Sequence, residues 1–115
     1  MKRLSVRTGI TIGTNCFKEG LVIPHYGYIV VNGTARFGKN CVLQCGVNIS
    51  ENANGGNHIY FGTGAKIMRN VHIANDVIIG ANAVVTHNII EDNVVLAGVP
   101  ASIISRKGYQ DRERV

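Results

Sequence analysis

Apolar residues recur at every sixth position over the middle of the chain, from Val31 to Val85. The residues four places after each of them are small or apolar as well. Nineteen of these twenty positions fit the pattern, whereas a hydrophobic fraction of 45% would give about nine by chance. The first positions of the hexads are Val31, Phe37, Leu43, Ile49, Gly55, Phe61, Ile67, Ile73, Ile79 and Val85, and the fifth positions are Ala35, Cys41, Val47, Ala53, Ile59, Ala65, Val71, Val77, Ala83 and Ile89. The one exception is Gly55.

A period of six differs from the period of a helix and from that of a plain amphipathic strand. It is typical of a short strand and a tight turn that alternate, so that three such units make a triangular coil of about 18 residues. Successive coils would stack by parallel pairing at roughly 4.8 Å, with the first and fifth residues of each hexad pointing inward. Gly, Asn and Asp, which are frequent between these positions, suit corners that need a positive φ angle. The pattern therefore predicts an all-β chain that forms a parallel β-helix.

The hexad pattern is broken near the N-terminus. The first residues fit it, but their phase differs by one from the phase that begins at Val31, so we expect a single slip in register within residues 17–20. In the later phase, Glu19 and His25 take first positions, where aliphatic residues are expected. Because local rules tend to fail at functional sites, residues 19–27 are the first place to search for one.

Two segments further along also depart from the pattern. The string SENANGGNH, at 50–58, has no large apolar residue and is either a loop outside the coil or a degenerate hexad. Val99-Pro100 closes the last coil, because a proline favours an extended residue before it. The charged segment that follows is a short helix or disordered. We therefore divide the chain into a β-helix domain, residues 1–105, and a C-terminal tail, residues 106–115.

Composition narrows the possible functions. The net charge is +5, with basic residues mainly near the two ends, which suits an anionic small molecule. Nucleic-acid binding is disfavoured because only seven aromatic residues are present, four Tyr and three Phe, and no basic stripe runs through the repeat. An odd number of cysteines, three, argues against a disulfide framework and for a reducing compartment. With no apolar core for a signal peptide and no run of 18 apolar residues, we expect a cytoplasmic protein outside the membrane.

The spacing of the histidines and cysteines outside residues 19–27 does not indicate a chemical role for them. No CxxC pair and no zinc-like histidine spacing is present, so we expect no metal site. Cys16 and Cys41 fall at inward positions and are expected to be buried. His72 and His87 are expected to face solvent, and His58 falls in the irregular segment.

Three longer strings carry a more specific signal: PHYGYIVVNGTARFGKN at 24–40, FGTGAKIMRNVHIANDVIIGANAVV at 61–85 and LAGVPASII at 96–104. Together with the hexads they resemble the left-handed parallel β-helix acyltransferases. The serine acetyltransferases, and their relatives that O-acetylate sugars in polysaccharide biosynthesis, are the most similar. The resemblance covers most of residues 12–104 and implies a left-handed coil, although the usual crossover rule would favour the opposite hand.

The resemblance implies an acetyl-CoA-dependent O-acetyltransferase with a small hydroxyl acceptor. In this family the matching histidine, here His25, is the general base that takes the proton from the acceptor hydroxyl during direct transfer. The resemblance also implies a homotrimer with coenzyme A bound between neighbouring subunits. The small-residue turns and the basic residues that match the family's coenzyme A site are Gly62, Thr63, Gly80, Ala81, Arg106 and Lys107.

The chain departs from the serine acetyltransferase pattern in several respects, among them Gly33 where a glutamate is typical and Ser50 where a glycine is typical. The coil before His25 has no carboxylate, so Glu19 is the nearest candidate to orient the imidazole. The loop after Ile49 is short, and no counterpart of the N-terminal helical domain is present. These departures favour a sugar hydroxyl over L-serine as the acceptor. They also keep open a second hypothesis, in which the chain is a truncated, non-catalytic β-helix that serves as an assembly or scaffold module.

Overall fold

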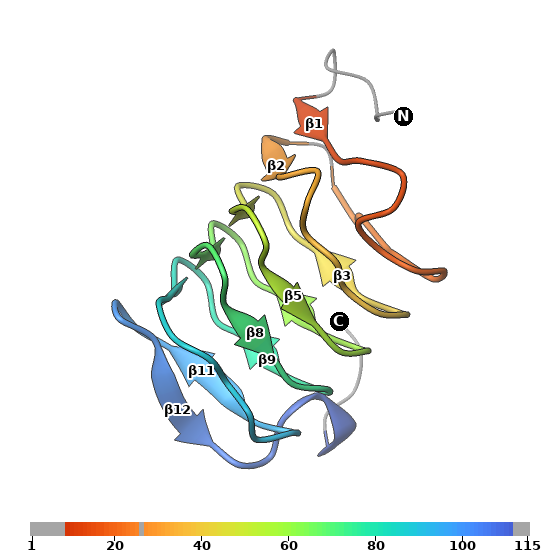
Figure 1. Cartoon of the computed structure of the whole chain (residues 1–115). Coiled ribbons are helices and arrows are strands. Elements are labelled where there is room, and N and C mark those ends of the chain that lie inside the picture. The colour runs from red at the N-terminus through yellow and green to blue at the C-terminus, as the bar shows by residue number, and fades with distance from the viewer. Residues whose placement is uncertain (1–8, 26, 112–115) are drawn as a thin grey trace.

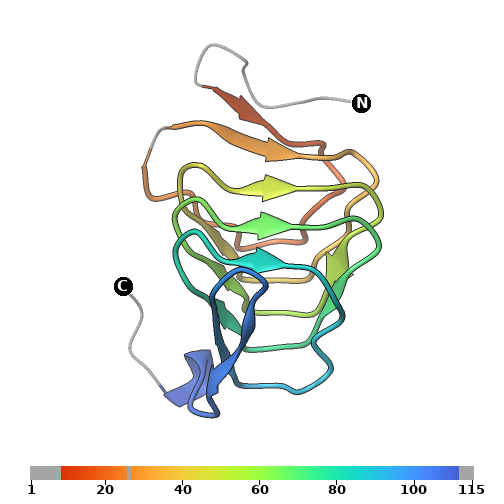
Figure 2. The same ribbon diagram turned by 90° about the vertical axis from the view of Figure 1, so that its left-hand side faces the viewer.

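The chain forms a three-sided column of stacked coils (Figures 1 and 2) in a computed structural model that describes residues 9–25 and 27–111. The strands are β1 (Ile10–Thr11), β2 (Ile29–Val31), β3 (Val42–Leu43), β4 (Asn48–Ile49), β5 (Asn54–Gly55), β6 (Tyr60–Phe61), β7 (Lys66–Ile67), β8 (His72–Ile73), β9 (Ile78–Ile79), β10 (Val84–Val85), β11 (Val95–Ala97) and β12 (Ser102–Ser105). The predicted all-β parallel β-helix is confirmed.

The strands form three sheets, one on each side of the column. The first has the order β1-β2-β4-β7-β10, and Figure 2 shows its five strands one below the other. The second has the order β12-β11-β9-β6-β3, and the third contains β5 and β8. All pairs are parallel except the pair of β11 with β12, where the chain folds back at the end of the column. Among the described residues, no helix is long and apolar enough to cross a membrane.

A repeat of 18 residues sets the register of the column. Paired residues are 18 apart in successive coils, as in Val30 with Asn48 and Asn48 with Lys66. All nineteen apolar residues that the hexads place inward are buried, and they form one continuous core. Burying an aliphatic side chain of this kind contributes about 1.5–3 kcal/mol, so the stacked interior stabilises every coil against its neighbours.

Three rows of turns form the edges of the column. We call them the glycine corner (residues 44–46, 62–64 and 80–82), the Glu51 corner (32–34, 50–52 and 68–70) and the asparagine corner (38–40, 56–58, 74–76 and 92–93). Most turns end on a residue with positive φ, which confirms the predicted use of Asn, Asp and Gly. The non-glycine residues in this conformation, with φ between 56° and 64°, are Asn40, Asn52, His58, Asn70, Asp76, Asn82 and Asn93.

The break in the pattern does not lie where the sequence predicts it. Phe17 pairs with Phe37 and Val22 with Val42, so the offset stays at 20 residues across the predicted slip within 17–20. The offset is 19 where β1 pairs with β2 and 18 where β2 pairs with β4. The register therefore changes on both sides of the predicted place, once before Phe17 and once between Val22 and β2.

Two extra residues lie between Val22 and Val30 compared with the equivalent segment of the next coil, which runs from Val42 to Asn48. As a result, His25 and Glu19 do not take inward positions, contrary to the hexad phase, and both are exposed. Phe17 and Ile23 pack against the core instead. The hexad pattern does not reveal the two extra residues, because Ile23 is apolar and falls at an inward position of the later phase. Only the strand pairing shows where the extra residues lie.

The irregular segment 50–58 is a degenerate hexad within the coil. Ala53 is fully buried, and β5 pairs with β8 in the regular register. Gly55, the exception in the hexad pattern, lies one coil from Phe37. A Cβ at Gly55 would lie 2.7 Å from the carbonyl oxygen of Ile73 and 2.8 Å from the Phe37 ring, so the backbone on one side and the ring on the other occupy the space that a side chain at 55 would need. Phe37 also stacks on Phe17, with ring centroids 5.3 Å apart, and meets the edge of Phe61 at 5.2 Å.

The C-terminal segment packs across the asparagine corner. After β12 the chain reaches a 3-10 helix, η2 (Tyr109–Asp111), and Tyr109 is only 2% exposed. Its ring stacks on the imidazole of His58, with centroids 3.9 Å apart and an interplanar angle of 11°, and meets Tyr60 edge-on. The main chain approaches closely because Gly108 has no side chain: a Cβ there would lie 2.5 Å from the nitrogen of Val94. Residues 112–115 of the predicted tail lie outside the described residues.

Restoring the apolar pattern at Gly55 should destabilise the protein. We expect Gly55→Val to lower the free energy of unfolding by about 1–3 kcal/mol, because the new side chain overpacks against Phe37. The measurement is urea unfolding at fixed protein concentration. Combining Gly55→Val with Phe37→Leu should recover only the part of the loss that the ring causes, because the carbonyl oxygen of Ile73 still lies 2.7 Å from the new Cβ. A single variant as stable as the parent would contradict this explanation of the exception.

Removing the Tyr109 ring should weaken the end of the column. We expect Tyr109→Ala to lower the free energy of unfolding by about 3 kcal/mol, because a buried aromatic side chain is lost. Tyr109→Phe, which retains the stack on His58, is the matched control and should lose much less. Thermal unfolding of the two variants at equal concentration measures the difference, and equal melting temperatures would show that the stack does not stabilise the fold.

Candidate active site

The loop that carries His25 lies in line with the turns of the glycine corner, one coil before the turn at 44–46. It connects Val22, which pairs with Val42 on the second sheet, to β2 on the first sheet. The backbone N–H of Gly46 donates to the carbonyl of Tyr28, which ties the loop to the turn of the next coil. Gly27 fits tightly over Cys45, because a Cβ at Gly27 would lie 2.4 Å from the Cβ of Cys45. The loop is therefore held at its C-terminal side, while the His25 side chain is exposed.

The turns predicted to hold coenzyme A continue the same corner. Gly64 N–H donates to the carbonyl of Cys45 (2.9 Å) and Asn82 N–H to the carbonyl of Thr63 (2.8 Å), so the turns stack directly. A side chain at Gly62 or Gly80 would meet backbone atoms of the next coil, so both positions favour glycine. Thr63 and Ala81, by contrast, are exposed. The structure thus brings His25, Gly62, Thr63, Gly80 and Ala81 to one edge of the column.

Arg106 and Lys107 lie at a different corner. They follow β12, which runs antiparallel to β11 and away from the glycine corner, and Gly108 N–H donates to the carbonyl of Asn93. Arg106 Nε lies 2.7 Å from Glu91 Oε2. Within one chain, these two basic residues are therefore separated from the glycine corner by the width of the second sheet.

Glu19, the predicted orienter of His25, also lies away from the glycine corner. Its carbonyl accepts a hydrogen bond from the N–H of Asn40, which places it at the asparagine corner. Its carboxylate is exposed and lies 3.9 Å from Lys39 Nζ. Among the described residues, no hydrogen bond or ion pair to the His25 imidazole is found.

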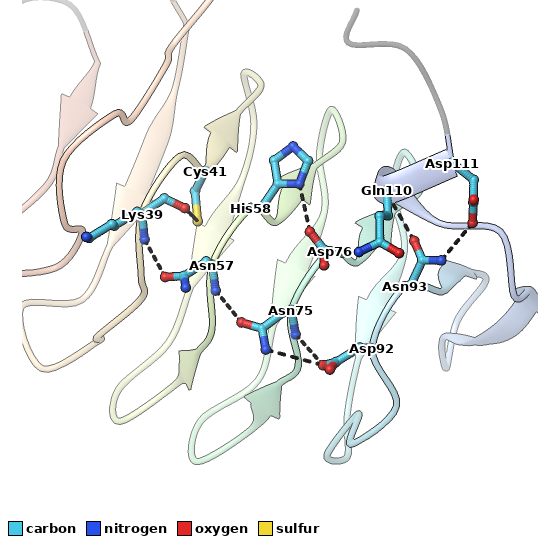
Figure 3. A network of polar contacts seen from close by, with 10 residues as sticks. All are labelled: Lys39, Cys41, Asn57, His58, Asn75, Asp76, Asp92, Asn93, Gln110 and Asp111. Atoms are coloured by element: carbon cyan, nitrogen blue, oxygen red, sulfur yellow. Dashed lines mark hydrogen bonds and ion pairs between the residues drawn. The ribbon is translucent and has the colours of Figure 1, made fainter.

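The asparagine corner carries a ladder of side-chain hydrogen bonds (Figure 3). The backbone N–H of Lys39 donates to Asn57 Oδ1 (2.9 Å), that of Asn57 to Asn75 Oδ1 (2.7 Å), and that of Asn75 to Asp92 Oδ1 (2.9 Å). Each side chain thus satisfies a backbone donor of the coil before it. The ladder is a structural device that fixes the spacing of the turns.

His58 and Asp76 form a pair at the same corner, with Nδ1 and Oδ1 2.8 Å apart, and both side chains are partly buried. Figure 3 shows that they come from equivalent places in adjacent coils. The hexad pattern points to neither residue as part of a site. The signal was available, because the two residues are 18 apart and an 18-residue coil stacks such residues. His72 and His87 are exposed, as predicted.

The cysteines provide no activated nucleophile or metal site in the described part of the chain. Cys16 and Cys41 are fully buried, as predicted, and Cys45 is half-buried at the glycine corner. Burial raises the pKa of the Cys41 thiol from 9.0 to about 11, so this thiol stays protonated near neutral pH. No group of three or more His, Cys, Asp or Glu residues within 9–25 and 27–111 has a geometry that could hold a metal ion.

The comparisons with known proteins give the same fold. No family sequence model and no curated protein sequence matches the chain. Among solved structures, a serine O-acetyltransferase of Brucella melitensis is 32% identical, with 80% of this chain and 39% of that chain covered and a TM-score of 0.71. A serine acetyltransferase of Brucella abortus strain S19, solved in complex with coenzyme A, is 30% identical over 82% of this chain and 40% of that chain, with a TM-score of 0.71.

A third structure, the serine acetyltransferase of Neisseria gonorrhoeae in complex with serine, is 24% identical over 84% of this chain, with a TM-score of 0.72, and shows the fold alone. The chain spans between 39% and 43% of the length of these three structures. The matched part is the column of coils described above. In its fold and repeat the chain is a left-handed parallel β-helix of the hexapeptide-repeat acyltransferase type, and it resembles the serine acetyltransferases.

Proposed function

We propose that the chain transfers an acetyl group from acetyl-CoA to the hydroxyl of a small acceptor. The observation that carries this proposal is the shared edge: an exposed histidine lies on the same corner as the small-residue turns at 62–64 and 80–82. Among its structural relatives, a serine acetyltransferase 30% identical to the chain is solved with coenzyme A bound. The arrangement would bring a thioester and a base to one place.

His25 would act as the general base. An alcohol is a weak nucleophile until a positioned base removes its proton, and imidazole suits this task near neutral pH. As the acceptor oxygen attacks the thioester carbonyl, its proton would pass to the imidazole, and the C–S bond would break to release coenzyme A as a thiol, which regains that proton. Backbone N–H groups would stabilise the oxyanion. Transfer is direct, which agrees with a protonated, buried Cys41.

Coenzyme A would lie along the glycine corner. The pantetheine arm would follow the exposed residues Thr63 and Ala81 of the two turns, which begin at Gly62 and Gly80. Arg106 and Lys107 are proposed to meet the phosphates. The ion pair of Arg106 with Glu91 is exposed, and such surface pairs contribute little, so the guanidinium can exchange the carboxylate for a phosphate. In a trimer, these groups would face the glycine corner of a neighbouring subunit.

The acceptor is proposed to be a sugar hydroxyl rather than L-serine. No carboxylate is found beside His25 in the described residues, and Glu19 faces Lys39 at another corner. A zwitterionic amino acid needs charged partners at the site, whereas a neutral sugar does not. We place the reaction in a cytoplasmic, polysaccharide-related pathway on the basis of the resemblance and of the free cysteines.

A homotrimer is proposed as the active assembly. The described surface exposes several large apolar side chains that are costly for a small monomer: Val22, Tyr28, Ile90, Val99 and Ile104. Two of them, Val22 and Tyr28, flank the His25 loop, where a neighbouring subunit would complete the site. A trimer would cover these side chains.

The alternative is a non-catalytic assembly module. It is favoured because no acidic side chain pairs with the His25 imidazole among residues 9–25 and 27–111, and because Glu19 faces Lys39 instead. Calorimetry with acetyl-CoA separates the two hypotheses, because a scaffold does not bind the thioester.

Substitution of His25 should remove most of the transfer activity. We expect His25→Ala to lower kcat by roughly 100-fold or more, because general base catalysis contributes about 10²–10⁴. Release of free thiol from acetyl-CoA in the presence of a panel of sugars and L-serine measures the rate. His87→Ala, an exposed histidine at another corner, is the control and should retain activity. Undiminished turnover by the His25 variant would refute the assigned role.

Sedimentation velocity should detect the trimer. At micromolar concentration we expect a mass three times that of the 12.4 kDa chain, because the exposed apolar side chains favour association. Tyr28→Glu should shift the equilibrium toward single chains, and the exposed substitution Lys66→Glu should not. A wild-type protein that sediments as a single chain would exclude the proposed assembly.

A further inference from the structure

A groove of about 470 Å³ crosses the first sheet and the Glu51 corner. One turn from each of three successive coils lines it, together with the outward side of β2 and β4. None of the residues assigned to acetyl-CoA, at the glycine corner or at 106–107, lines it. Its volume falls in the range of small-molecule sites.

The polar groups of this groove are available to a ligand. Asn32 Oδ1 accepts hydrogen bonds from the N–H and the hydroxyl of Thr34, which fixes the amide and leaves its Nδ2 donors for other partners. For the Asn48 amide and the Ser50 hydroxyl, no hydrogen bond is found among the described residues. Two carboxamides and a hydroxyl therefore line the groove with unused donors and acceptors.

Two opposite charges complete the lining. Glu51 Oε1 and Arg69 Nη1 lie 3.9 Å apart, and their side chains are 54% and 73% exposed. An exposed pair at this distance contributes little, so both side chains can turn to a ligand at small cost. Because the charges are equal and opposite, the groove favours neither a free anion nor a free cation.

The apolar part of the lining narrows the ligand class further. Val30, Met68 and the buried Ile49 also line the groove. A purely apolar ligand would leave the amides of Asn32 and Asn48 unpaired, which is unfavourable. A neutral ring that has hydroxyl groups at its rim and C–H groups on its face satisfies both kinds of surface.

We propose that this groove is a binding site for one or two sugar rings of a saccharide. The ring hydroxyls would exchange hydrogen bonds with Asn48, Ser50, Glu51 and Arg69, and a C–H face would pack on Met68. Strand β2 connects the groove to the His25 loop, so a longer saccharide would extend toward that loop. Only this last connection rests on the proposed acetyl transfer.

The test is a titration of the intact protein with maltose, followed by NMR of the methionine methyl groups and the asparagine side-chain amides. We expect saturable shifts at Met68 and Asn48 in the millimolar range, below about 100 mM. Asn48→Leu should weaken binding about tenfold, because a ligand hydroxyl loses its partner. Lys66→Leu, on the same face one coil on and outside the lining, should bind as the parent does.

Three results would overturn the proposal: no saturable shift at Met68 and Asn48, unchanged binding by the Asn48 variant, or shifts with L-serine and none with maltose. The wild-type titration decides the matter even where a variant fails to fold. Since it contains no acetyl-CoA, it is independent of catalysis. Saccharide binding to this groove without any acetyl transfer would refute the proposed function and leave the groove proposal standing. Acetyl transfer without saccharide binding to this groove would refute the groove proposal and leave the proposed function standing.

Discussion

The structure depends on the stacking of inward side chains from coils of 18 residues. Parallel pairing places each residue one coil from its equivalent, so every inward position meets the same position above and below it. Large side chains stack on one another at most of these positions, as Leu43, Phe61 and Ile79 do, whereas Gly55 leaves room for the ring of Phe37. The same repetition aligns the turns into three edges, where the backbone needs Asn, Asp or Gly at positive φ. The continuous core, the three edges and the ladder of hydrogen bonds at the asparagine corner all follow from this one register.

The same constraint explains where the candidate site lies. Extra residues cannot be added inside the coil without disrupting the stack, so the two between Val22 and Val30 lie outside it, at the glycine corner. His25 is exposed in this loop, and the stacked turns at 62–64 and 80–82 extend along the same edge. A local break in a regular column thus produces a polar, accessible place beside a row of small residues. The proposed chemistry needs both features.

Much of the fold follows from sequence because inward positions of a β-helix tolerate few residue types. The buried core, the 18-residue coil and the corner residues were all predictable from the hexads. The position of the register changes was not, because Ile23 fits the later phase and outward residues leave no periodic signal. The exception at Gly55 depends on the ring in the coil above. The contact of Tyr109 with His58 joins the tail to a turn 51 residues earlier and has no local signature. Of the predicted coenzyme residues, four lie on one edge with His25, and Arg106 and Lys107 lie at another corner.

A crystal structure of the protein with coenzyme A bound tests the account most directly. The account predicts that the pantetheine arm lies along the glycine corner, in contact with the turns at 62–64 and 80–82, and that its sulfur ends within reach of the His25 imidazole. Coenzyme A bound along the asparagine corner or the Glu51 corner, or with its sulfur far from His25, would contradict it.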